Sequence, residues 1–158
     1  MSETQLVMRS PVGPLRLRTD GHKLTEIRFV TDPEESSDSP ILRETQRQLV
    51  AYFAGELDEF DLPIEPSGTD FQRRVWQELL NIPYGETTSY GEVATRLGLP
   101  PSASRAVGLA NGSNPISIVV PCHRVIGANG SLTGYGGGLD NKRLLLELES
   151  QRRDDVLF

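Results

Sequence analysis

Hydrophobic and polar positions alternate near the start of the chain. Apolar side chains partly alternate with polar ones over 6–10, 14–19 and 24–30, and these segments are rich in residues that favour strands. Asp20 and Gly21, between the last two segments, are typical of a hairpin turn. The pattern therefore predicts a small antiparallel sheet.

A helical period replaces this alternation after an acidic segment rich in serine and proline, 31–40, which we expect to form an exposed loop. The apolar positions of 41–53 fall on one face of a helix, which Gly55 is expected to end. A linker follows. The pattern thus predicts two domains, 1–68 and 69–158.

The second domain begins with helices. Asp70 is expected to cap a helix that reaches Leu80, with Trp76 in the core. Further helices are expected over 89–98 and 101–112. The last two resemble a helix-turn-helix, whose second helix reads DNA. Helix pairs of this size are common in other proteins too, so their spacing alone leaves both interpretations open.

The only cysteine follows an apolar, β-branched run, 116–120, which predicts a buried strand that the next proline ends. Cys122 at such a place is ordinarily inert core, and His123 can equally be structural. The alternative is a reactive thiol. The positive charge of His123 and Arg124 favours a thiolate, and Glu149 on the last predicted helix is a carboxylate that could orient the imidazole.

The glycine-rich stretch 127–138 fits no regular element and predicts a wing or a loop wrapped closely around a ligand. It lacks the pattern of a phosphate-binding loop, so we set nucleotide binding aside. The final helix is expected to begin at Asp140, as its cap.

Composition and charge narrow the classes of function. The 158 residues are 37% hydrophobic, enough to build a core. Residues 1–70 hold seven basic and 14 acidic side chains and residues 71–158 hold nine and eight, so charges of −7 and +1 give the net −6. The second half is therefore compatible with DNA, although charge alone would give modest affinity.

A single cysteine excludes an internal disulfide and a multi-thiolate zinc site. No apolar run is long enough to cross a bilayer, and the first ten residues lack the pattern of a secretion signal. We expect a cytoplasmic protein with no metal, no cofactor and no membrane partner.

The string PCHRVIG, preceded by GSNPISIVV and followed by GSLTGYGGG, resembles the active-site signature of the O6-alkylguanine-DNA alkyltransferases, also called methylated-DNA–protein-cysteine methyltransferases. The similarity runs from GTDFQRRVW through SRAVGLANGSNPI to LLLELE and is looser over 1–68. It implies an α/β (α+β) fold, with a ribonuclease H-like N-terminal module before a winged helix-turn-helix domain.

The resemblance implies direct reversal of DNA damage. Cys122 would take the alkyl group from O6 of guanine, or from O4 of thymine, in one irreversible turnover. His123 would abstract the thiol proton through a bridging water, Glu149 would hold the imidazole, and Asn114 would brace the turn around the site. The partner would be double-stranded DNA containing O6-alkylguanine, approached through the minor groove by a monomer, with cooperative assembly on DNA left open.

The same resemblance implies the contacts to DNA. Because the reactive carbon lies on a base edge inside the duplex, the base must be flipped out. Arg105 would fill the gap in the stack, and Tyr90 would donate to the departing base. The implied base pocket comprises Tyr90, Val125, Tyr135 and Gly136, and the implied DNA contacts are Ser102, Ala103, Arg105, Ala106 and Arg124.

The chain departs from some relatives. Gly136 and Gly134 stand where some carry serine and asparagine, which removes a hydroxyl from the implied base contact and favours a wider pocket. The N-terminal zinc site of some relatives cannot form here, since Cys122 is the only cysteine. Two alternatives remain: a protein of this fold that recognises damage without transfer, and a cysteine hydrolase.

Overall fold

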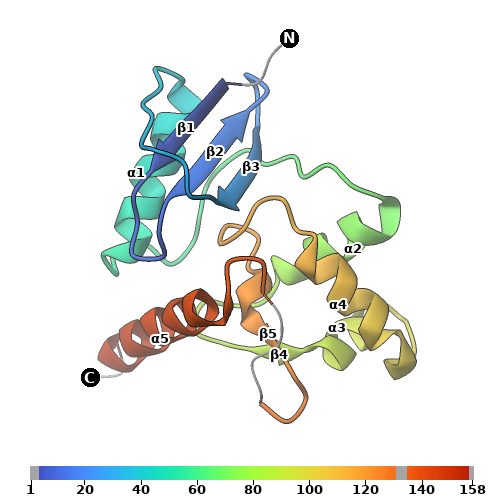
Figure 1. The fold of residues 1–158 in the computed structure, drawn as a ribbon. Coiled ribbons are helices and arrows are strands. Elements are labelled where there is room, and N and C mark those ends of the chain that lie inside the picture. Colours follow the sequence, from blue (N-terminus) through green and yellow to red (C-terminus); the bar gives the residue numbers. More distant parts are fainter. Residues whose placement is uncertain (1–3, 131–134, 157–158) are drawn as a thin grey trace. The chain divides into compact units, whose positions relative to one another are not determined.

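A computed structural model describes residues 4–130 and 135–156, with side chains up to residue 151. The chain forms two compact units, divided between Ser67 and Gly68 (Figure 1). The sequence places this boundary one residue further along. Within the described residues, no helix is both long and apolar enough to cross a membrane.

The first unit is a three-stranded antiparallel sheet, β1 (Thr4–Met8), β2 (Leu15–Thr19) and β3 (Leu24–Phe29), in the order β1-β2-β3. Helix α1 (Pro40–Phe53) lies along one face of the sheet (Figure 1). The alternating pattern predicts this arrangement, because every second side chain of a strand points to the same face. The core between sheet and helix includes Leu6, Leu15, Leu17, Ile27, Leu42, Leu49 and Tyr52.

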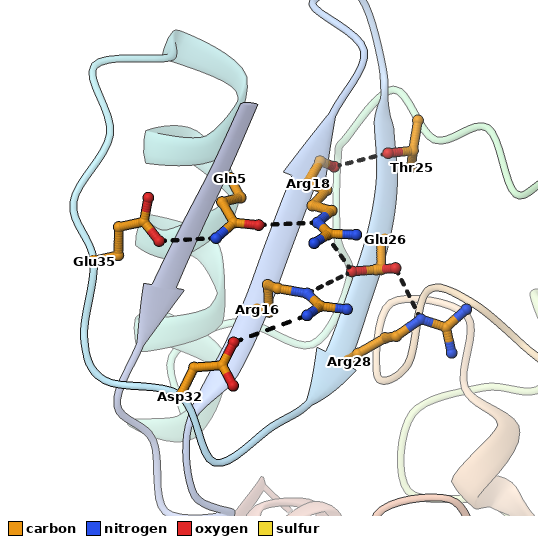
Figure 2. Close-up of polar contacts among 8 residues, drawn as sticks. All are labelled: Gln5, Arg16, Arg18, Thr25, Glu26, Arg28, Asp32 and Glu35. Atoms are coloured by element: carbon orange, nitrogen blue, oxygen red, sulfur yellow. Dashed lines mark hydrogen bonds and ion pairs between the residues drawn. The ribbon is translucent and has the colours of Figure 1, made fainter. Parts of the chain in front are cut away.

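The other face of the sheet is polar (Figure 2). The Glu26 carboxylate accepts hydrogen bonds from Nε of Arg16 at 2.9 Å and of Arg28 at 2.8 Å. Arg18 donates to Oε1 of Gln5 at 3.1 Å. Burial raises the pKa of Glu26, but the three arginines outweigh it and the pKa is lowered. These cross-strand contacts tie all three strands together on the face that α1 leaves open.

Two predicted connections are present. Asp20 Oδ1 accepts from the backbone amides of His22 and Lys23, which closes the hairpin as expected. The acidic loop 31–40 is exposed over much of its length, yet Glu35 pairs with Val7 through two backbone hydrogen bonds of 2.9 and 3.0 Å. The loop is therefore held beside β1.

The second unit is mainly helical. Helices α2 (Asp70–Leu79), α3 (Tyr90–Arg96) and α4 (Ser104–Gly112) pack on one another (Figure 1). Trp76 of α2 is buried, and its indole donates to the Ala110 carbonyl at 2.8 Å. Trp76 is thus a core residue, as predicted. The elements are α2 (Asp70–Leu79), β4 (Thr88–Ser89), α3 (Tyr90–Arg96), η1 (Pro101–Ala103), α4 (Ser104–Gly112), η2 (Cys122–Arg124), β5 (Val125–Ile126) and α5 (Leu139–Val156).

Three predicted helix boundaries need correction. The cap of α2 is Thr69, which forms a capping box with Gln72, and Asp70 lies in the first turn. Helix α5 begins at Leu139, so Asp140 also lies inside the first turn. The helix ends at Leu79, one residue before the predicted Leu80, which is the C-cap residue and is 41% exposed.

The predicted strand 116–120 is wrong. The segment is buried, but the Val119 amide donates to the Ser117 carbonyl at 2.8 Å, with Ile118 between them at φ 73°. This is a three-residue turn in a backbone region that β-branched residues rarely adopt. A second three-residue turn, centred on Pro121, follows at once.

The side chain of Asn114 explains this conformation. Its Oδ1 accepts from the Ile116 amide at 3.0 Å and its Nδ2 donates to the Val120 carbonyl at 2.8 Å. The Asn114 side chain thus satisfies the buried amide of Ile116 and the buried carbonyl of Val120, which in a sheet would be hydrogen-bonded to a neighbouring strand. The pairing that does occur nearby joins β4 and β5 in parallel, with Thr88 opposite Val125.

Candidate active site

Cys122 opens the short helix η2 and is only 4% exposed. Pro121 precedes this helix as its N-cap residue, so the thiol lies at the start of a helix and not at the end of the predicted strand. The Cys122 carbonyl accepts from Nδ2 of Asn111 on α4 at 3.3 Å. The turn that carries the thiol is thus tied to α4, the second helix of the predicted helix-turn-helix.

His123 and Glu149 lie side by side in the interior. Nε2 of His123 is 2.8 Å from Oε2 of Glu149, and the two side chains are 0% and 1% exposed. Glu149 also accepts two hydrogen bonds from Arg124, from Nε at 2.8 Å and from Nη2 at 3.0 Å. One carboxylate of α5 therefore binds two consecutive side chains of η2.

The charges at this cluster determine the state of the imidazole. Burial raises the pKa of the Glu149 carboxyl, but His123 and Arg124 outweigh it and lower the pKa to about 2. Burial lowers the pKa of His123 below 6.5 despite Glu149, so the imidazole is neutral at neutral pH. An ionised carboxylate can only accept, so Nε2 carries the proton and Nδ1 keeps its lone pair. Nδ1 is buried without a hydrogen-bond partner among the described residues.

The expected thiolate is not favoured. Burial raises the pKa of the Cys122 thiol above 9.0, against smaller lowering effects from Asn114, Lys142 and Tyr135. The charge of Arg124 does not help, because Glu149 neutralises it at 2.8 Å. The thiol is therefore protonated at neutral pH and needs a base to react.

Arg124, expected to contact DNA, is buried instead. It is 6% exposed, and its Nη1 donates to the Ile82 carbonyl at 2.7 Å. Its guanidinium carbon lies 5.7 Å from the centre of the Tyr84 ring. Glu149 and Ile82 occupy the guanidinium in this structure, which disfavours the expected contact to DNA.

Lys142 is a site residue that the sequence reasoning missed. Its side chain on α5 is fully buried, and its Nζ donates to the Val125 carbonyl at 2.7 Å. Burial lowers the pKa of Lys142, and ionisation of the Cys122 thiol opposes this shift. A signal was present: Lys142 precedes Leu145 by three residues and Glu149 by seven, the spacing of one helix face.

The expected DNA contacts lie together on η1 and α4. Ser102, Arg105 and Ala106 are exposed, and Ala103 is half-buried. Among the described residues Arg105 has no hydrogen-bond or ion-pair partner. This stretch therefore presents a free cation among small side chains.

The expected pocket residues are placed as follows. Tyr90 begins α3, and a Cβ built on Gly108 of α4 would lie 3.6 Å from its ring, an ordinary van der Waals distance, so the ring lies beside α4. Burial raises the pKa of Tyr135 well above 10.0, with smaller raising effects from a negative charge on Cys122 and from a hydrogen bond to its side chain. Val125 is buried, and Gly136 is exposed. Gly134 lies outside the described residues.

Asn114, Tyr135 and Lys142 act on the Cys122 thiol, and Glu149 binds the next residue of the chain, His123. Within the part of the chain that the structure describes, no three His, Cys, Asp or Glu side chains gather as metal ligands would. The cluster supplies a buried thiol, a neutral base and a carboxylate that orients the base. Such a set suits nucleophilic chemistry at sulfur.

Comparisons with known proteins agree with this geometry. Residues 5–66 match the ribonuclease-like domain of 6-O-methylguanine DNA methyltransferase, and residues 70–151 match its DNA-binding domain. The chain is 58% identical over 149 residues to the methylated-DNA–protein-cysteine methyltransferase of Mycobacterium tuberculosis, covering 90% of each chain. Its identity to the protein of that name from Methanosarcina acetivorans is 54% over 150 residues, covering 90% of this chain and 96% of the relative.

Solved structures give the same result. The crystal structure of Mycobacterium tuberculosis OGT in complex with DNA superposes with a TM-score of 0.85 at 56% identity, covering 92% of each chain. The O6-methylguanine methyltransferase of that organism superposes with a TM-score of 0.87 at 54% identity, covering 96% of this chain and 94% of that one. The predicted fold class is confirmed, and the chain belongs to the 6-O-methylguanine DNA methyltransferase family.

Proposed function

We propose that this protein repairs alkylated DNA by moving the alkyl group from O6 of guanine in a duplex to Sγ of Cys122. The observation that carries the proposal is the buried array of Cys122, neutral His123 and ionised Glu149. The relatives support the same reaction class, since they are named methylated-DNA–protein-cysteine methyltransferases.

The reaction needs only groups of this chain and the DNA. Nδ1 of His123 takes the thiol proton, directly or through a water, and the sulfur attacks the alkyl carbon in line with its bond to O6. The C–S bond forms as the C–O bond breaks, and the electron pair stays on the departing guanine. A proton from the Tyr90 hydroxyl neutralises the base. The thioether has no leaving group of comparable quality, so each molecule reacts once.

Burial of the thiol requires that the base leave the duplex. The alkyl carbon lies on the edge of a stacked base, where a sulfur that is 4% exposed cannot align with the C–O bond. Arg105 fills the vacated gap, and the small residues Ala103 and Ala106 let α4 lie close to the backbone in the minor groove. Tyr135 lines the pocket for the flipped base.

Further parts of the proposal concern the setting. O4-alkylthymine is a second substrate, with the alkyl group on the corresponding exocyclic oxygen. The protein acts as a monomer in the cytoplasm, where reducing conditions keep its free thiol available. A damage-binding protein without transfer is the competing function, and the presence of Cys122 beside a base disfavours it.

The test is transfer to a mapped residue. The protein is incubated with a duplex containing one O6-methylguanine, and the peptide that holds Cys122 is analysed by mass spectrometry, with Cys122→Ala as the matched variant. We expect one methyl group on Cys122, loss of transfer in the variant and retained binding of the duplex. An unmodified Cys122, or transfer by Cys122→Ala, overturns the proposal.

A further inference from the structure

The most exposed large hydrophobic side chain among the described residues lies on α4. Leu109 is 72% exposed, whereas Val50, Leu139 and Leu80 are 55%, 43% and 41% exposed. An exposed apolar side chain is ordinary when it stands anywhere on a surface. Its position on this helix is what requires an explanation.

Leu109 follows Arg105 by four residues, which places the two side chains one helical turn apart on the same face. The opposite face of α4 is the buried one, with Val107, Ala110 and Asn111. Small residues flank Leu109 on the exposed face: Ala106 precedes it by three positions, and Gly112 follows by three. Leu109 therefore projects beyond its neighbours, next to the one cation of α4.

We propose that Leu109 packs against the deoxyribose wall of the duplex beside the gap that Arg105 fills. This inference rests on the proposed function, in which α4 is the DNA-reading helix. The sugars in the walls of a groove present carbon atoms to a protein that lies close to them, and a leucine buries its own apolar surface there without neutralising a phosphate.

The charge of the molecule supports this occupant. Residues 71–158 carry a net charge of only +1, so few phosphates can be neutralised and ionic affinity is modest. An apolar contact adds affinity that is independent of salt and of base sequence. Both properties suit a protein that must find one altered base at any position in a genome.

The experiment compares Leu109→Ala, Leu109→Met and the control Val50→Ala, an exposed apolar residue on α1 of the other unit. All are made in the Cys122→Ala background, so that binding to an O6-methylguanine duplex is measured without turnover. We expect Leu109→Ala to bind about tenfold more weakly. Leu109→Met should bind like the parent protein because it keeps apolar area, and Val50→Ala should also be unchanged.

The salt dependence separates an apolar contact from an ionic one. Each phosphate contact contributes about 0.9 to the slope of log affinity against log salt concentration. Leu109→Ala should leave this slope unchanged, so that it weakens binding by the same factor at every salt concentration tested. Its melting temperature should not fall, because alanine is a better helix former and the leucine is 72% exposed.

Transfer kinetics with an intact Cys122 complete the test. Leu109→Ala should require more duplex for half-maximal rate, reach the same maximal rate, and react normally with the free base O6-benzylguanine. Unchanged duplex affinity of Leu109→Ala, or failure of Leu109→Met to restore it, overturns the inference.

The variant Arg105→Ala distinguishes this failure from failure of the proposed function. If Arg105→Ala slows transfer from duplex DNA while Leu109→Ala has no effect, only the role of Leu109 is wrong. If neither variant affects transfer from duplex DNA, α4 is not the reading helix, and the role of Leu109 fails together with that of Arg105. Methylation of Cys122 tests the transfer itself.

Discussion

His123 and Glu149 share a hydrogen bond of 2.8 Å that fixes which imidazole nitrogen is free to act as a base. The ionised carboxylate accepts the proton on Nε2, so Nδ1 holds the lone pair, and Nδ1 has no partner among the described residues. Arg124 binds the same carboxylate and keeps it ionised. Glu149 therefore determines the tautomer of the catalytic imidazole although it does not contact the alkyl group.

Glu149→Gln should slow transfer by about a hundredfold, because an amide can turn its own donor toward Nε2 and no longer favours the reactive tautomer. The same change leaves Arg124 buried without its counter-charge, which should lower the free energy of unfolding by about 3 kcal/mol. Rates are measured in single turnover at a temperature where circular dichroism shows the variant folded. An unchanged rate in folded Glu149→Gln would remove the orienting role.

Acid unfolding gives a second readout of the same residue. The pKa of Glu149 is lowered from 4.5 to about 2 by folding, so its stabilising contribution is present above pH 4.5 and is lost as the pH falls from 4.5 towards 2. The free energy of unfolding of the wild-type protein, measured with denaturant, should therefore decrease as the pH falls across this window. That of Glu149→Gln should decrease less steeply. Parallel curves for the two proteins would contradict the lowered pKa.

The pH dependence of transfer follows from two pKa shifts of opposite direction, in His123 and in Cys122. Burial lowers the pKa of His123 below 6.5, so the base should lose activity only as the pH falls through that lowered value. Burial raises the pKa of Cys122 above 9.0, so no free thiolate should contribute at neutral pH. Single-turnover rates with saturating duplex should be flat from about pH 7 to 8. A rate that rises tenfold per pH unit in this range would indicate direct attack by a thiolate.

The pattern of the chain predicts the first unit well. Its strands alternate in part, most clearly in β2, Asp20 closes the hairpin with its own side chain, and Gly55 has the positive φ of 77° expected after a helix. Each of these signals is local. A reader of the sequence needs no knowledge of distant contacts to find them.

The turns before Cys122 could not be predicted in the same way. A continuous apolar run indicates burial, but it is compatible with a strand or with any other buried backbone. Here the side chain of Asn114 supplies the backbone hydrogen bonds, and Ile118 takes a φ of 73° that no propensity scale favours. The strands β4 and β5 have two residues each and are too short to leave a pattern.

The active site could be predicted from the sequence only in part. The resemblance to a known family selects Cys122, His123 and Glu149, but proximity in sequence misleads about charge. Arg124 is two residues from Cys122, yet its guanidinium forms an ion pair with Glu149 and does not act on the thiol. The cation that the thiol does experience comes from Lys142, twenty residues away. Such a pairing depends on how α5 packs, which local patterns do not record.

Lys142→Met should slow transfer at pH 7 by about tenfold, with partial recovery at higher pH, because loss of the ammonium raises the pKa of the thiol further. Methionine keeps most of the buried volume but leaves the Val125 carbonyl without this donor. The matched control is Arg143→Met, which removes a charge from an exposed position of the same helix. If the two variants have the same pH profile, Lys142 only anchors α5.

Gly136→Ser tests whether this glycine widens the base pocket. No described atom lies within 4 Å of a Cβ built on Gly136, and its φ lies outside the left-handed region, so serine should change the free energy of unfolding by less than about 0.5 kcal/mol. Gly138→Ser is the matched control two residues on: space is also open there, but φ is 92°, so serine should destabilise by about 1 kcal/mol.

The functional outcome is a change in selectivity between adducts. A serine hydroxyl at 136 should hydrogen-bond the flipped base and narrow the pocket, so the ratio of O6-benzylguanine to O6-methylguanine transfer rates should fall about two- to tenfold. Both substrates are compared within the same duplex sequence, so that binding through α4 cancels from the ratio. An unchanged ratio in a stable Gly136→Ser protein would show that residue 136 does not determine which adduct sizes are accepted. The open space beside Gly136 would then be filled by solvent and would not be part of the pocket for the bound base.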